Sequence, residues 1–190
     1  MSLTDRPTVQ TVLVCLVTFA VQSVLGVFGV GLGTFALSFP LEVRPWTLVT
    51  ATYAHAGVTH LLANLVALLV VGLVVERGTT ASRFHAFFVL TGALAGVAEL
   101  VVAAVLGGGA AVIGASGAVF ALLGYALAGN RVVGVVAPKV RLDRAATLGL
   151  FVVVAAVLTL VTAAPDLALV AHFTGLLGGL VAGRRRLLRA

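Results

Sequence analysis

Long apolar blocks, separated by short polar stretches, run along almost the whole chain. Each approaches the roughly 20 residues that a helix needs to cross the hydrocarbon core of a bilayer. A backbone in lipid must satisfy its own hydrogen bonds, and the chain lacks the regular alternation of barrel strands. The pattern therefore predicts an all-α membrane protein, a bundle of six transmembrane helices in a single domain, 1–190. The helices are expected at about 9–31, 58–75, 84–106, 115–130, 145–163 and 168–183.

Two connections stand out between these blocks. Residues 32–57 are apolar but broken by Pro40 and Pro45, and we expect this external loop to lie in the membrane interface. Residues 131–144 form the main cytoplasmic connection. The first block is long for a signal peptide and lacks a cleavage motif, so we expect a retained anchor helix.

Composition agrees with a membrane protein. The chain is 61% hydrophobic and 9% charged, with a mean hydropathy of +1.21, which excludes an ordinary soluble domain. Cys15 is the single cysteine, so no disulfide framework is possible.

The net charge of +6 reflects topology rather than a nucleic-acid partner. With the N-terminus in the cytoplasm, Arg44 is the single basic residue outside. This positive-inside bias predicts that both termini are cytoplasmic. The lipid bilayer is an expected partner, and the plasma membrane is the expected location. The cytoplasmic basic residues would be Arg6, Arg77, Arg83, Arg131, Lys139, Arg141, Arg144, Arg184, Arg185, Arg186 and Arg189.

Polar residues inside membrane spans are costly and indicate function. At about 1.5 Å per residue, Asn64, Ser116 and His172 come from three different helices at nearly one depth, in the outer half of the membrane. His60 lies one turn above Asn64 on the same helix face. Glu99 also falls in the outer half, where it would line a wet cavity or anchor its own helix.

Small residues favour close packing of the fourth and sixth helices. Gly175, Gly179 and Gly183 form one stripe. A second stripe is expected on the fourth helix, at Ser116, Phe120, Gly124 and Ala128. Such faces let backbones approach and bring Ser116 within reach of His172.

These groups fit acyl transfer. Histidine is the usual base for a serine nucleophile, so His172 would activate Ser116 as a dyad. The start of the helix at Ser116 offers free N–H groups to an oxyanion, and Asn64 and His60 can add donors. His55, His60 and His172 could instead bind zinc, but no HExxH motif supports a metal site, and no cofactor is expected.

Three segments resemble the signature segments of rhomboid intramembrane serine proteases. They are "HAGVTHLLANL" (55–65), "GASGAVFALLG" (114–124) and "AHFTGLLGG" (171–179), and the resemblance runs from about residue 9 to 183. It implies Ser116 as nucleophile, His172 as base and His60 with Asn64 as oxyanion support.

The resemblance also implies supporting residues, namely His55, Gly72, Glu76 and Phe120, beside the glycines Gly175 and Gly179. Phe120 stands where many relatives carry tyrosine, so a ring would remain beneath the imidazole without its hydroxyl. Trp46 is followed by Thr47, where the family often has arginine, so the bonding of the external loop is expected to differ.

The activity implied is hydrolysis of peptide bonds in or near the transmembrane segments of single-span membrane proteins. Two other classes remain open. A non-catalytic rhomboid-like protein would bind or escort membrane clients on the same scaffold, and a small transporter would use the polar residues as a relay, although no internal repeat supports it.

Overall fold

The computed structural model describes residues 5–129, 144–161 and 168–190, and there the regular elements are helices. One isolated antiparallel bridge joins Leu37 to Val112. The long helices are α1 (Pro7–Val27), α3 (Val58–Val75), α4 (Ala81–Val105), α5 (Ser116–Gly129), α7 (Arg144–Val161) and α8 (Leu169–Arg184). The short ones are α2 (Thr47–Tyr53) and three 3₁₀ turns, η2 (Leu32–Thr34), η3 (Leu41–Val43) and η4 (Glu76–Gly78).

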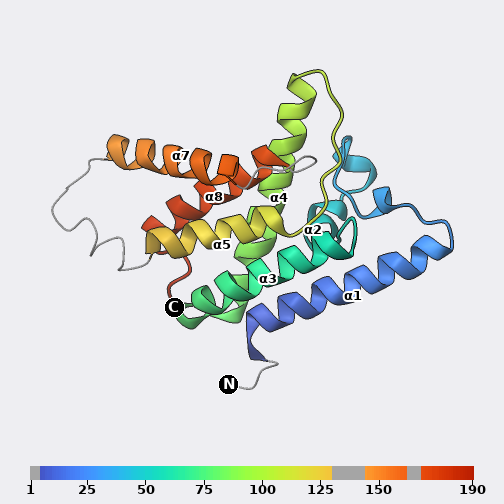
Figure 1. Ribbon diagram of the computed structural model, residues 1–190, viewed down its shortest axis with the longest axis horizontal. Coiled ribbons are helices and arrows are strands. Elements are labelled where there is room, and N and C mark those ends of the chain that lie inside the picture. The colour runs from blue at the N-terminus through green and yellow to red at the C-terminus, as the bar shows by residue number, and fades with distance from the viewer. Residues whose placement is uncertain (1–4, 130–143, 162–167) are drawn as a thin grey trace.

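The long helices form a row that one helix crosses. In Figure 1, α1, α3, α5, α8 and α7 follow one another, each in contact with the next, and α4 crosses the row steeply. The most extensive contact joins α5 to α8. Both of these helices also pack on α4, which places α5 and α8 at the centre of the bundle.

Where the structure describes them, the helix boundaries are close to those expected, and the first helix is the least accurate. The expected ends at 130 and 163 lie outside the described residues. The helix expected at 9–31 runs from Pro7 to Val27. It starts early because proline is favoured in the first helical turn, and it ends early because Gly29 adopts a left-handed conformation, with φ 84°. The expected connection 131–144 lies almost wholly outside the described residues.

Three of the described helices are long and apolar enough to cross a membrane, namely those at Pro7–Val27, Val58–Gly78 and Ala81–Val105. The helices at Ser116–Gly129, Ala145–Leu160 and Leu169–Arg184 are apolar but shorter. Large aliphatic side chains on α3 and α4 face outward, such as Val70 and Leu94, each 66% exposed, as a lipid-facing surface requires. The count of six crossings stays a prediction.

An ion pair and the candidate serine lie at opposite ends of the bundle. At one end, Arg6 Nε lies 2.6 Å from Glu76 Oε1, and Thr8 N–H donates to Glu76 Oε2 over 3.1 Å. The N–H of Ala190 donates to the carbonyl of Gly78, so the described chain begins and finishes at this end. Ser116 begins α5 at the other end. The cytoplasmic placement of the termini stays a prediction.

The segment 32–57 is tied together by side-chain bonds to the backbone. The Arg44 guanidinium donates to the carbonyl of Gly33, and Trp46 Nε1 donates to the carbonyl of Thr34 over 3.0 Å. Thr47 is 1% exposed and donates its hydroxyl to the carbonyl of Arg44 over 2.6 Å. Arg44, two residues before Trp46, therefore links two parts of this segment, and Thr47 anchors the start of α2.

Candidate active site

Ser116 and His172 lie in direct contact at the same end of two adjacent helices. Ser116 is the first residue of α5, and His172 lies in the first turn of α8. Ser116 Oγ is 2.9 Å from His172 Nε2, which is hydrogen-bonding distance. This is the geometry of a serine with an adjacent general base.

The imidazole of His172 is held between a ring and the protein interior. Phe120 stacks on it, with 4.4 Å between ring centroids and 13° between planes. His172 is 3% exposed. If Ser116 donates to Nε2, the ring proton sits on Nδ1, which has no hydrogen-bond partner among the residues that the structure describes. The geometry is that of a two-residue pair without an orienting carboxylate.

His60 faces the pair from α3. It contacts the loop before Ser116, because a Cβ on Gly114 would lie 2.6 Å from His60 Cε1. Gly114 also has φ 124°, a conformation that other residues rarely adopt. The absence of a side chain at Gly114 therefore makes room for the His60 ring.

His55 packs against the ring of His60 and supports its position. It is fully buried, its Nδ1 lies 3.0 Å from the carbonyl of Tyr53, and its ring meets His60 edge to face, with 5.3 Å between centroids. Gln22 of α1 fixes the same residue, since its side-chain amide accepts from the N–H of His55 over 3.1 Å and donates to its carbonyl.

Asn64 lies one turn deeper on α3 than His60. Its Nδ2 donates to the carbonyl of His60 over 2.9 Å, and its side chain is 6% exposed. It is not among the residues that line the cavity beside Ser116. The geometry brings Ser116, His172 and His60 together, and it holds Asn64 against its own helix.

A small cavity of about 140 Å³ opens beside Ser116, with room for a few water molecules. His60, Ser116 and His172 supply its polar side chains, and the backbone from Ala111 to Gly114 forms another wall. The N–H groups in the first turn of α5 lie at the same place and have no acceptor within their helix. The cavity thus combines a hydroxyl, imidazoles and backbone donors.

Glycines on α8 set its distance from α5. A Cβ on Gly175 would lie 2.1 Å from the carbonyl oxygen of Gly117, and one on Gly179 would lie 2.0 Å from that of Ala121. The α8 stripe is as expected. The expected α5 stripe also faces α8, because Ser116 and Phe120 contact His172 and Gly124 approaches the backbone of α8. The backbone of Gly117 and Ala121 lies against α8 as well, opposite Gly175 and Gly179.

Two residues near the site were not given these roles by sequence reasoning. Gln22 was overlooked, although a glutamine inside an apolar span is itself a signal. Glu99 was expected to line a wet cavity or to anchor its own helix, and its Oε2 accepts from the N–H of Ala171 in α8 over 2.9 Å. It therefore caps the first turn of α8 from α4, one residue before His172. Within the described ranges, no three His, Cys, Asp or Glu side chains lie close enough together to hold a metal ion.

Comparisons with known proteins agree on one family. The model of the Rhomboid domain matches residues 42–189. The chain is also 37% identical over 87 residues to RHOMBOID-like protein 5 of Arabidopsis thaliana, a match that covers 45% of this chain. It spans 27% of the length of that relative. The domain match covers most of the chain and includes both Ser116 and His172, so this multi-pass integral membrane protein belongs to the rhomboid family.

Proposed function

We propose that the chain is a serine endopeptidase that cleaves membrane proteins in or near a transmembrane segment. The observation that carries the proposal is the 2.9 Å contact between Ser116 Oγ and His172 Nε2. Membership of the rhomboid family supports the same chemistry, as does the cavity beside the pair.

In the proposed reaction, Ser116 Oγ attacks the carbonyl carbon of the scissile bond and its proton passes to His172 Nε2. The oxyanion that forms is stabilised by N–H groups at the start of α5 and by His60. His172 then protonates the leaving amine, and an acyl group remains on Ser116. Water, activated by His172, hydrolyses this ester and restores the hydroxyl.

The substrate class follows from where the pair lies. Ser116 sits at the end of apolar helices whose outer faces are aliphatic, so a substrate arrives through or beside lipid. A regular helix hides its carbonyl groups in internal hydrogen bonds. The proposed substrate is therefore a single-span protein whose helix ends or unwinds at the level of the cavity, in the outer part of the membrane.

The test is cleavage of tagged single-span substrates by the purified chain, with cut sites mapped by mass. Ser116→Ala is expected to lower turnover by at least about 10³-fold, because the nucleophile is lost. Ser23→Ala is the matched control, since Ser23 lies in the apolar helix α1 and donates to the carbonyl of Phe19 within that helix. It is expected to cleave at the wild-type rate.

A phosphonate probe for active-site serines separates catalysis from binding. Labelling should occur at Ser116 and be lost in His172→Ala. If the folded wild-type chain takes up no probe and cleaves no substrate in the panel, the protease assignment is wrong, and the non-catalytic role in binding membrane clients replaces it.

A further inference from the structure

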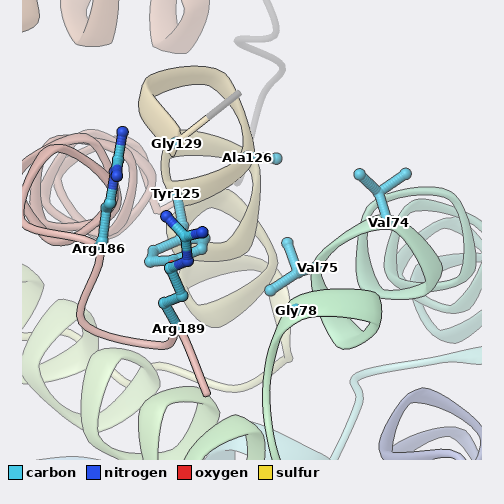
Figure 2. A pocket seen from close by; sticks show the side chains of 8 residues that line it. All are labelled: Val74, Val75, Gly78, Tyr125, Ala126, Gly129, Arg186 and Arg189. Carbon is cyan, nitrogen blue, oxygen red and sulfur yellow. The ribbon is translucent and has the colours of Figure 1, made fainter. Parts of the chain in front are cut away.

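A second and larger pocket lies at the end of the bundle away from Ser116. Its volume is about 310 Å³, more than twice that of the cavity at Ser116. Three elements form it: the end of α3 with η4, the last turns of α5, and the chain that follows α8. Figure 2 shows Arg186 and Arg189 on one side, where Tyr125 of α5 also lies, and Val74 and Val75 on the other.

The segment that carries the two arginines is fixed in place. Leu188 is 4% exposed and packs in the core with Val75 and Phe84. The N–H of Leu188 donates to the hydroxyl of Tyr125 over 3.2 Å. Arg83 donates to the carbonyl of Arg189. The backbone that carries the two arginines is therefore positioned by the fold before any ligand binds, which reduces the entropy cost of binding.

The charge of the pocket is positive and unbalanced. Within the ranges that the structure describes, no carboxylate lies within ion-pair distance of Arg186 or Arg189, and the nearby Glu76 is paired with Arg6. Further arginines gather at the same end, including Arg77 in η4 and Arg184 at the end of α8. A guanidinium presents several donors in a plane that matches the oxygens of a phosphate group.

The apolar side of the pocket indicates that the phosphate belongs to a lipid. Val74 lines the pocket and is 50% exposed, and Val70, one turn back along α3, is 66% exposed. This aliphatic path leads from the pocket along the outside of the bundle. A phosphate bound by the arginines would thus leave its acyl chains on the surface of α3. Basic pockets at the cytoplasmic ends of membrane helices bind anionic headgroups in this way.

We propose that this pocket binds the phosphate headgroup of an anionic phospholipid, with Arg186 and Arg189 as the recognising residues. The site is independent of the proposed protease chemistry, because it lies at the opposite ends of α3 and α5.

The experiment counts bound lipids on the full chain by native mass spectrometry in a neutral detergent. Phosphatidylglycerol and phosphatidylcholine with identical acyl chains are added at equal concentration. We expect at least about a tenfold preference for phosphatidylglycerol. The double variant Arg186→Gln, Arg189→Gln should lose this preference.

The matched control is Arg184→Gln, Arg185→Gln, which removes the same charge from the two preceding positions, outside the pocket lining. It should keep the preference. A second variant, Ala126→Phe, fills the pocket while keeping both arginines, and it should lower retention of phosphatidylglycerol to the level of phosphatidylcholine. Equal losses in the two arginine pairs, or full retention in Ala126→Phe, would overturn the proposal.

A competition arm distinguishes lipid from free phosphate. Inorganic phosphate and glycerol phosphate are added at millimolar concentration to the chain loaded with phosphatidylglycerol. Retention of the lipid supports the proposal, because soluble anions lack the contact with α3. Complete displacement by inorganic phosphate would identify a site for soluble phosphate and refute the lipid assignment.

Discussion

The contact between α5 and α8 makes Gly179 a sensitive test of the proposed chemistry. A Cβ placed on Gly179 would lie 2.0 Å from the carbonyl oxygen of Ala121, whereas ordinary van der Waals contact begins at 3.4 Å. The shortfall is about 1.4 Å. The opposing atom belongs to the backbone, so no side-chain rotation relieves the clash and Gly179→Ala must push the two helices apart.

A separation of α5 and α8 by this distance should displace Ser116 from His172. Gly179 lies seven residues beyond His172 on the same helix, about 10 Å along its axis. If most of the displacement is transmitted, Ser116 Oγ and His172 Nε2 move from 2.9 Å to beyond hydrogen-bonding distance. A misplacement of about 1 Å costs on the order of 10²-fold in rate, and overpacking costs about 1–3 kcal/mol of stability.

The assay measures kcat on a single-span substrate together with the midpoint of thermal unfolding. Gly178→Ala is the control, because a Cβ at Gly178 meets nothing within 4 Å. It should match the wild type in both measurements. If Gly179→Ala cleaved as fast as Gly178→Ala, the close approach of the helices would not be what holds the pair together.

Three further variants test single contacts at the two ends of the bundle. Glu99→Ala removes the acceptor for the N–H of Ala171 and should lower kcat about tenfold or more with little change in KM, whereas Glu99→Gln should largely restore kcat through its amide oxygen. Both effects are measured by steady-state kinetics. Phe120→Leu removes the ring stacked on His172 and should slow labelling by a serine probe about 3- to 10-fold, whereas Phe120→Tyr should label at close to the wild-type rate. Equal rates in the two Phe120 variants would exclude stacking as the role of the ring. Glu76→Gln breaks the ion pair with Arg6 and should cost about 1–3 kcal/mol of stability in an unfolding titration, while the rate of cleavage per folded molecule stays unchanged.

Residues whose partners lie at predictable positions along a helix could be placed from the sequence. Ser116 and His172 fall at one depth because the rise of a helix is fixed at about 1.5 Å per residue. The stripe at Gly175 and Gly179 can be recognised in the sequence because small residues recur at four-residue intervals. Depth and face follow from helix geometry alone, so the serine–histidine pair could be predicted.

Contacts that depend on how helices rotate and cross could not be predicted. The backbone contacts of Gly117 and Ala121 with α8 were not predicted, because a step of one position turns the face of a helix by about 100°. Glu99 bonds to the backbone of Ala171, and Gln22 bonds to the backbone of His55, both far away in sequence. Every residue has a backbone, so the pattern of side chains does not identify such a partner. The Nδ2 of Asn64 donates to the carbonyl of His60, four residues earlier in the same helix, and its expected role at the oxyanion stays a prediction.

Several contacts around His172 hold its imidazole in place, and each of them limits a different motion. Backbone contact at Gly175 and Gly179 fixes the distance between the axes of α5 and α8. The same contact does not fix the position of α8 along its own axis relative to α5, because small-residue stripes repeat every four residues. The bond from Glu99 to the N–H of Ala171 fixes that position against a third helix, α4. Phe120 then sets the plane of the ring. Because each contact limits a different motion, losing any one should loosen the pair in its own direction, and two losses combined should cost more than their sum wherever both act on the same Oγ–Nε2 distance.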